Sequence, residues 1–164
     1  MGQQQLILLV LATVIVGVAI VIGVRAFTEN SVKQNYDALV HDAMRIASDA
    51  NAWKQKPESF GGQATASKGA GVWTGITMSK LGYAQINASA DADGAAQATC
   101  ITNENGVFQL NLDGSVTAGN SANRNLVVVD FPLSSGNDSS EPQLDQEAST
   151  RGSAATDAIP TCTA

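Results

Sequence analysis

The side chains of this 164-residue chain that could do chemistry are few and lie far apart. The single histidine, His41, has no serine or cysteine nearby to activate, which favours a surface or subunit-contact histidine over a catalytic one. Asp91, Asp93 and Gly94 resemble the start of a calcium-binding loop, but the glutamate that closes such a loop is absent. An ordinary acidic turn is therefore expected there.

Other signatures of catalysis are also missing from the sequence. It contains no glycine loop that could cradle a phosphate, no nucleophile elbow and no pair of carboxylates in an apolar setting. The aromatic residues are too few for an electron-carrying path, and Phe27, Tyr36 and Trp53 are instead expected to pack a helix against a sheet, with Trp73 in a loop. We therefore predict no enzyme, no cofactor, and no catalytic, cofactor-binding or metal-ligating residue.

The two cysteines, Cys100 and Cys162, lie 62 positions apart. Metal sites generally use closely spaced cysteine pairs together with histidine, and His41 is far upstream. One disulfide, formed outside the cytoplasm, is favoured over two buried free thiols. By the chain-entropy model, closing a loop of this length stabilises the fold by roughly 4 kcal/mol.

The charge balance argues against nucleic acid as a partner. Acidic residues outnumber basic ones by 15 to 9, for a net charge of −6, and the basic residues form no cluster in the sequence. Phosphate binding depends on clustered Lys and Arg. No nucleic-acid binding is expected.

The longest apolar run, Leu6–Val24, holds no charged residue and is interrupted only by Thr13, Gly17 and Gly23. As a helix it would be nearly 30 Å long by the usual rise of about 1.5 Å per residue, which is enough to cross a bilayer. No Lys or Arg precedes the run, and it is long for the apolar core of a secretory signal. We therefore predict that this segment spans a membrane or forms the centre of an assembly.

The next stretch is amphipathic. Apolar residues recur at steps of three and four, which is typical of a helix with one buried face. Pro57 and then Gly61 and Gly62 end the pattern. We predict one helical domain over residues 1–56, of which 1–25 are transmembrane or filament core and 26–56 amphipathic, and a globular antiparallel β domain over 57–164. The recurring residues are Val32, Tyr36, Leu39, Val40, Ala43, Ile46, Ala47, Ala50 and Trp53.

The remaining sequence predicts a small antiparallel meander of three or four strands. Residues 98–102 and 107–112 flank Asn103-Glu104-Asn105-Gly106, a hairpin signal, and 116–118 and 126–131 are further strands. Residues 78–83 are expected to form a short helical turn or strand. Residues 134–157 have the polar, low-complexity composition of a disordered segment.

This arrangement resembles that of a type IV pilin. The resemblance is carried by Gly2, Leu6–Val24, Val32–Trp53, the strands near 98–131, and Cys100 with Cys162. It implies an α+β fold and a disulfide-closed C-terminal loop. It also implies a structural subunit of an extracellular helical filament, polymerised through the N-terminal helix and serving adhesion or surface attachment. The implied partners are copies of the chain itself, the inner membrane before assembly and the pilus assembly machinery, at a bacterial cell surface.

The sequence departs from the pilin pattern in two places. Only Met1 precedes Gly2, where prepilins carry a basic leader, and Ile7 stands where they carry an early glutamate. An uncharged polar cluster is a workable substitute, because burying an unpaired ion is costly. We expect the N-terminus to be retained or lightly trimmed. The residues expected in the filament core are Gln3, Gln4, Gln5, Leu6, Leu9, Thr13, Gly17, Ala19 and Gly23.

Two other functions remain open. A single-pass, membrane-anchored extracytoplasmic binding protein needs only lipid around Leu6–Val24, and a pseudopilin of a secretion system shares the pilin plan. A filament additionally requires the apolar half of the helix to pack against copies of itself. Small residues there permit close approach, although membrane helices use them too.

Overall fold

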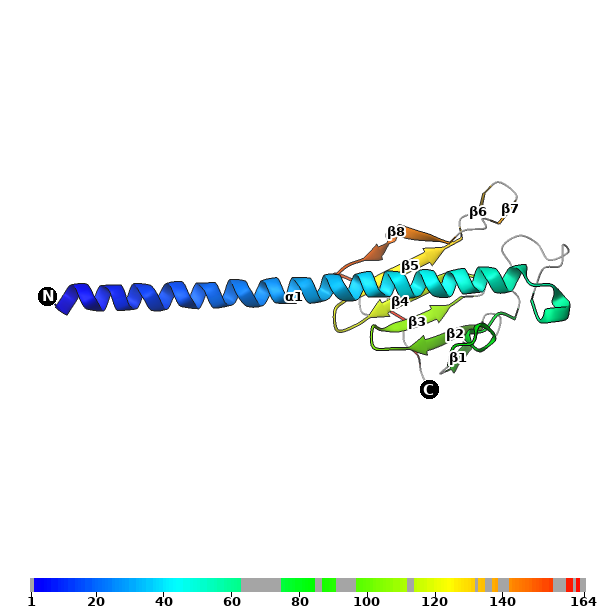
Figure 1. Ribbon diagram of the computed structural model, residues 1–164, viewed down its shortest axis with the longest axis horizontal. Helices are drawn as coiled ribbons and strands as arrows, with labels where there is room; N and C mark the ends of the chain where they lie inside the picture. The colour runs from blue at the N-terminus through cyan, green and yellow to red at the C-terminus, as the bar shows by residue number, and fades with distance from the viewer. Residues whose placement is uncertain are drawn as a thin grey trace. The chain divides into compact units, whose positions relative to one another are not determined.

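The computed structural model describes residues 2–62, 75–84, 87–90, 97–111, 114–131, 133–134, 137–138, 142–154, 159–160 and 162. The chain forms two compact units, residues 1–34 and residues 35–164. The order of the elements can be followed in Figure 1. Trp73 and the Asp91–Gly94 turn lie outside the described residues.

One helix, α1 (Gly2–Gln55), supplies the first unit and the beginning of the second. It runs for 54 residues, as predicted from the uninterrupted periodicity. Pro57, which lacks an N–H donor, follows the helix, and the chain turns through a short 3-10 helix, η1 (Glu58–Phe60). Gly61 then adopts a left-handed conformation with φ of 79°, which glycine reaches without steric cost.

The second unit contains a six-stranded antiparallel sheet, so the predicted α+β class is confirmed. The strand order is β1 (Asn87–Ala90), β2 (Gln97–Thr102), β3 (Val107–Leu110), β4 (Val116–Asn120), β5 (Asn125–Asp130), β8 (Gln143–Thr150). A separate two-stranded sheet pairs β6 (Leu133–Ser134) with β7 (Asn137–Asp138).

The prediction of three or four strands was wrong at both edges of the sheet. The hairpin at residues 103–106 is confirmed, because Thr102 pairs with Val107 and the Asn103 N–H donates to the Gly106 carbonyl. The edge strands β1 and β8 were not predicted, and β8 lies inside the segment that composition marked as disordered. Residues 78–81 form the 3-10 helix η2 (Met78–Leu81), the helical of the two predicted alternatives.

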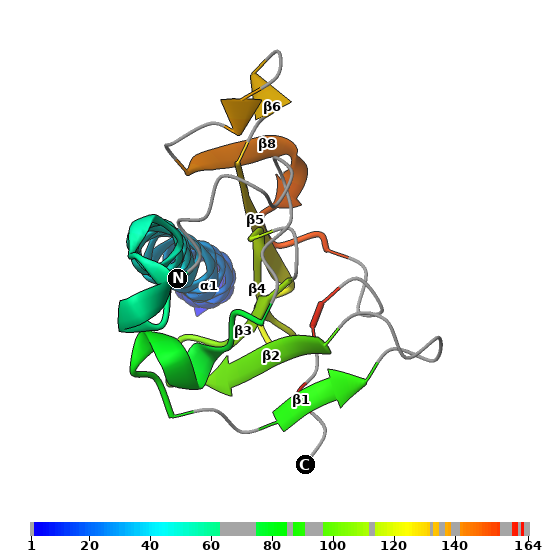
Figure 2. The ribbon, with the colours of Figure 1, turned by 90° about the vertical axis from the view of Figure 1, so that its right-hand side faces the viewer.

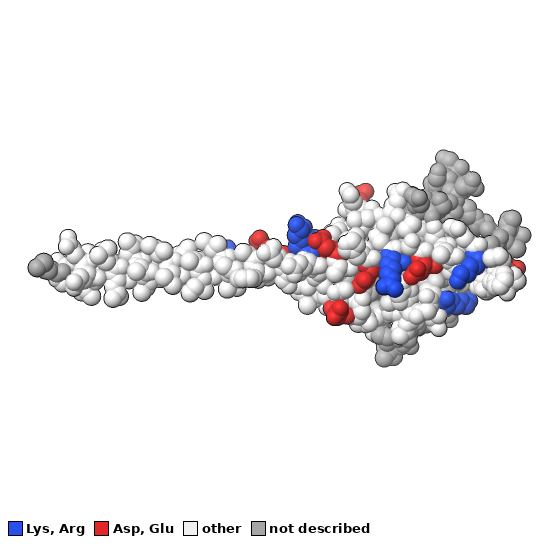
Figure 3. Space-filling model, viewed as in Figure 1, with Lys and Arg blue, Asp and Glu red and all other residues white. Residues whose placement is uncertain are grey.

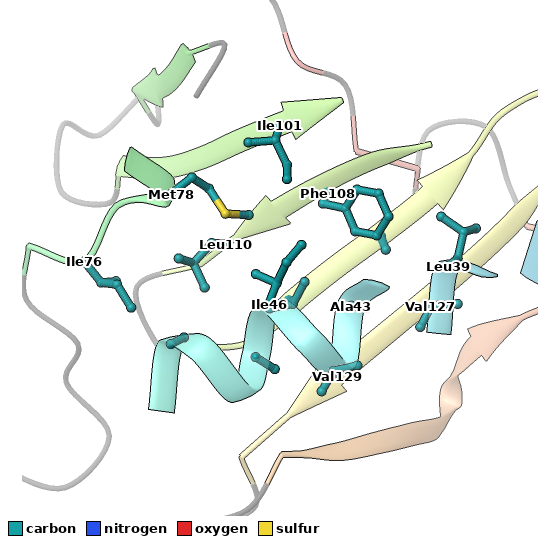
Figure 4. Close-up of a cluster of buried hydrophobic side chains, with 14 of the residues drawn as sticks. Leu39, Ala43, Ile46, Ile76, Met78, Ile101, Phe108, Leu110, Val127 and Val129 are labelled. Atoms are coloured by element: carbon teal, nitrogen blue, oxygen red, sulfur yellow. The ribbon is translucent and has the colours of Figure 1, made fainter. Parts of the chain in front are cut away.

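The core lies between one face of α1, from Leu39 onward, and one face of the sheet (Figures 2 and 4). The amphipathic positions predicted from Leu39 to Trp53 are buried or half-buried. Phe27, which was expected to pack against the sheet, is instead 80% exposed, so that prediction was wrong. The sheet, η2 and the residues next to them contribute the buried Ile76, Met78, Ile101, Phe108, Leu110, Val116, Ala118, Val127, Val129 and Phe131.

The last described residues pack on the opposite face of the sheet from α1 (Figure 2). Gly119 on β4 permits this approach, because a Cβ there would lie 2.7 Å from Ile159 Cγ2 and 3.0 Å from Pro160 Cδ. Cys162 then forms the predicted disulfide with Cys100 on β2, with the two Cα atoms 5.9 Å apart. The C-terminal segment is thus fastened across the back of the sheet.

Candidate functional site

The most unusual surface of the described residues is the apolar half of α1. The large hydrophobic side chains between Leu6 and Val24 are 54–68% exposed. By length and composition this helix could cross a membrane, with a mean hydropathy of 3.2 in its most apolar window and none of that window buried inside the protein. The hydrophobic effect strongly disfavours leaving such a surface in water. The segment must therefore be covered by lipid or by protein.

Polar groups on this segment are satisfied within the helix. The Thr13 hydroxyl donates to the Val10 carbonyl at 2.8 Å, so no free donor faces the surroundings. A Cβ added at Gly17 or Gly23 would meet no atom within 4 Å. Thr13 and Gly17 are four residues apart, as are Ala19 and Gly23, and such small-residue pairs lie on one helix face where a second helix can approach closely.

The glutamines at the start of α1 are the other predicted assembly residues. Gln3, Gln4 and Gln5 are helical and exposed, and the first turn of α1 carries no acidic residue. Their side-chain oxygens can accept hydrogen bonds, while their amides can donate. The first backbone N–H groups of any helix have no partner within the helix, which makes such acceptors useful there.

A cluster of asparagines, missed in the sequence, joins α1 to two turns of the sheet. Asn35 Nδ2 donates to the Asn105 carbonyl at 2.8 Å, and Asn120 Nδ2 donates to the same oxygen at 2.7 Å. Asn105 Nδ2 in turn donates to Asp42 Oδ2 at 2.8 Å. These residues come from α1, the β2–β3 turn and the end of β4. They fix the helix to the sheet.

A second set of contacts holds η2 against the end of α1. The Tyr83 hydroxyl donates to Asp49 Oδ2 at 2.5 Å, and burial together with this hydrogen bond raises the pKa of Tyr83 to about 12. The Lys80 ammonium lies 5.6 Å from the centre of the Trp53 ring, within cation–π range. The buried Met78 N–H donates to Thr99 Oγ1 on β2 at 2.9 Å.

Among the described residues, the side chains with possible chemistry do not form a cluster. His41 is exposed on α1, and the described residues contain no group of three or more His, Cys, Asp or Glu side chains that could hold a metal ion. A surface hollow of about 220 Å³ is lined by Asp130, Gln143, Leu144 and Asp145. It is open to solvent.

No protein-family model, no curated protein and no solved structure matches this chain. Its fold, a long N-terminal apolar helix whose later turns pack on an antiparallel sheet, is compatible with a pilin-like fold. The apolar segment suggests membrane anchoring or secretion. The disulfide suggests an oxidising, extracytoplasmic location.

Proposed function

We propose that the chain is the structural subunit of an extracellular helical filament that polymerises through the apolar half of α1. The observation that carries the proposal is the exposed apolar surface from Leu6 to Val24, on the same helix that supplies the core of a folded domain. Lipid covers this surface before assembly, and copies of the same segment cover it afterwards. Adhesion or surface attachment is the role that such a filament serves.

The continuity of α1 favours assembly over simple anchoring. An anchor needs only apolar length, and a loose connection to its domain is sufficient. Here no break separates the apolar segment from the buried residues Leu39 and Trp53. The small residues Gly17, Ala19 and Gly23 also supply places where neighbouring helices can approach closely.

Substitution of Gly17 tests the proposal. Gly17→Leu adds bulk where the chain itself has open space, so the folding and membrane insertion of the subunit should be unchanged. Filament yield, measured by electron microscopy of sheared cell-surface material, should fall sharply because the added side chain separates the helices. Val18→Leu, a small enlargement at the next position, serves as the control. A normal filament yield from Gly17→Leu would favour the anchored monomer.

A membrane-anchored extracytoplasmic binding protein is the second candidate, because lipid alone could cover a helix of this length and hydropathy. A pseudopilin of a secretion system would have the same apolar helix and folded domain. Mass spectrometry of the main band in sheared cell-surface material distinguishes a filament subunit from an anchored protein. An anchored protein would remain in the membrane fraction, whereas a filament subunit would dominate the sheared material.

A further inference from the structure

The β2–β3 turn contains the one Asn-Gly pair of the sequence, Asn105-Gly106. Asparagine followed by glycine is prone to deamidation, because glycine carries no side chain that would hinder the approach of its nitrogen. In this reaction the Gly106 nitrogen attacks the side-chain carbonyl carbon of Asn105, and its proton leaves with the side-chain amide as ammonia. Water then opens the resulting succinimide to aspartate or isoaspartate. Nothing is oxidised or reduced, and water is the only co-reactant.

Hydrogen bonds restrain both groups that react. The Gly106 N–H donates to Asn103 Oδ1 at 3.1 Å, so the nucleophilic nitrogen is engaged within the turn. The side-chain amide of Asn105, which leaves as ammonia, donates from Nδ2 to Asp42 Oδ2 at 2.8 Å. Closure of the ring moves both groups and therefore has to break these hydrogen bonds, which slows the reaction in the folded protein.

The peptide unit between Asn105 and Gly106 is held by further contacts. The Asn105 carbonyl oxygen accepts from Asn35 Nδ2 at 2.8 Å and from Asn120 Nδ2 at 2.7 Å. Gly106 is closely packed, since an added Cβ would lie 3.0 Å from Leu39 Cδ2. The rotation of this peptide unit that carries the nitrogen towards the side chain is therefore restricted while α1 contacts the turn.

Asp42 on α1 connects these restraints. Its Oδ2 also accepts from Asn103 Nδ2 at 2.9 Å, so one oxygen anchors the leaving amide and the residue that holds the nucleophile. An aspartate at position 105 would bring a second carboxylate against Asp42, with no proton to donate. Acidic and basic side chains are interspersed on the face of the domain shown in Figure 3. The direct contact with Asp42, and not the general charge of that face, therefore disfavours the product.

We propose that Asn105 is a deamidation site that the contact with α1 keeps unreactive. When the turn opens, Asn105 converts irreversibly, and the carboxylate of the product keeps the turn from docking on α1 again. A copy whose turn has opened is thereby marked chemically. The site lies within the second unit, so it does not depend on the proposed filament.

Peptide mass spectrometry of the full-length protein in detergent tests the proposal. The protein is incubated in mildly alkaline buffer, which favours loss of the Gly106 N–H proton, and the converted fraction of Asn105 is followed with time. Conversion in the folded wild type should be about a hundredfold slower than in the same chain unfolded in urea. Asp42→Ala should accelerate conversion in the folded protein about tenfold. Asp42→Asn keeps an acceptor oxygen and should convert at nearly the wild-type rate.

Two controls distinguish opening of the turn from other effects. Asp37→Ala removes an exposed carboxylate in the preceding turn of α1 and should leave the conversion of Asn105 unchanged. Ile46→Val weakens the buried core and should also leave it unchanged, because local opening and not global unfolding exposes the site. The proposal is overturned if Asn105 converts equally fast in folded and unfolded protein, if it does not convert in urea, or if Asp42→Ala behaves like the controls.

Hydrogen exchange of the turn tests the effect of the product. The Asn103 N–H donates to the Gly106 carbonyl at 3.0 Å, so its exchange reports opening of the turn. Asn105→Asp should accelerate this exchange about tenfold at neutral pH, where both carboxylates are ionised. Asp42→Asn combined with Asn105→Asp swaps the amide and the carboxylate and should restore the wild-type rate. An unchanged rate in Asn105→Asp, or no rescue in the double variant, would overturn the proposed effect of the product.

Discussion

The buried side-chain amide of Asn125 donates a 2.9 Å hydrogen bond to Asn35 Oδ1 on α1. Its own oxygen accepts from the Gly152 N–H, also at 2.9 Å. Asn125 is fully buried at the start of β5. One amide therefore connects the helix, the sheet and the segment after β8, and it serves as donor and acceptor at once.

Replacing this amide should destabilise the second unit strongly. Asn125→Leu keeps roughly the same volume but leaves Asn35 Oδ1 and the Gly152 N–H without these hydrogen bonds. Buried polar groups that lose a partner cost about 1–3 kcal/mol each, so we expect a loss of about 2–4 kcal/mol in the free energy of unfolding. Urea unfolding of the full chain in detergent, followed by tryptophan fluorescence, measures it. Asn123→Ala, in the turn that precedes β5, is the control, and equal stability of both variants would contradict the prediction.

The turn at Gly106 should tolerate no side chain. A Cβ there would lie 3.0 Å from Leu39 Cδ2 and would overlap the Gly119 carbonyl oxygen. Gly106→Ala should therefore push the β2–β3 turn away from α1 and lower the unfolding free energy by about 1–3 kcal/mol, as overpacking generally does. The neighbouring Glu104→Ala, at an exposed side chain, should change stability by less than about 0.5 kcal/mol. Similar unfolding curves for the two variants would show that the turn can shift freely.

Hydrophobic periodicity predicted α1 and the inner strands because burial of their apolar side chains determines where these elements lie in the fold. Leu39, Phe108 and Val127 are fully buried, Leu39 on the apolar face of an amphipathic helix and Val127 within the apolar run 126–129. The apolar segment could also be predicted, since a run of membrane-spanning length is a signal along the sequence alone. What covers this segment in the assembly depends on neighbouring molecules, which the sequence of one chain does not describe.

β8 could not be predicted because hydrophobic burial does not define it. Along Gln143–Thr150 no residue is fully buried. Asp145 Oδ1 accepts from the Glu147 and Ala148 N–H groups at 2.9 and 3.0 Å, and the pairing with β5 shifts register nearby. Ser149 Oγ accepts from the Val128 N–H at 3.0 Å. These hydrogen bonds use side-chain oxygens of a polar stretch. Composition alone cannot distinguish such a stretch from a disordered segment.

The asparagine contacts were missed for a related reason. Asparagine is typical of turns, so the residue type of Asn103, Asn105 and Asn120 indicates turn positions and not a contact with the helix. Their partner Asn35 lies on a helix face, 70 positions before Asn105. A local pattern contains no sign of a contact at that separation, whereas the hairpin turn itself was correctly predicted.

Removing the disulfide should weaken the fold without abolishing the sheet. Cys100→Ser combined with Cys162→Ser frees the C-terminal segment from the face of the sheet opposite α1. It also increases the number of conformations open to the unfolded chain. We expect the free energy of unfolding to fall by about 2–4 kcal/mol. Reductant should destabilise the wild type by a similar amount and leave the double variant unchanged. A wild type insensitive to reductant, despite complete reduction of the bond, would contradict this.

The burial of Tyr83 and its hydrogen bond to Asp49 should make stability fall at alkaline pH. The folded protein holds the Tyr83 proton more tightly than the unfolded chain, since the pKa is raised from 10.0 to about 12. This contribution is fully present below pH 10 and is lost as the pH rises towards about 12, where the phenol ionises in both states. Unfolding free energies measured across this interval should therefore decline more in the wild type than in Tyr83→Phe. Tyr36→Phe leaves the bond in place and should decline like the wild type.

The glutamines at the start of α1 should matter for assembly and not for insertion. Gln3, Gln4 and Gln5 bring neutral amides to a helix start whose backbone N–H groups lack helical partners. In a filament core those groups would be removed from water, where each unsatisfied donor costs about 1–3 kcal/mol. Replacing all three by leucine should leave membrane insertion intact while lowering filament yield. Replacing all three by asparagine keeps the amides and should preserve assembly, as measured by pelleting and negative-stain microscopy. Equal yields from the leucine and asparagine variants would show that the amides do not act in the assembled core.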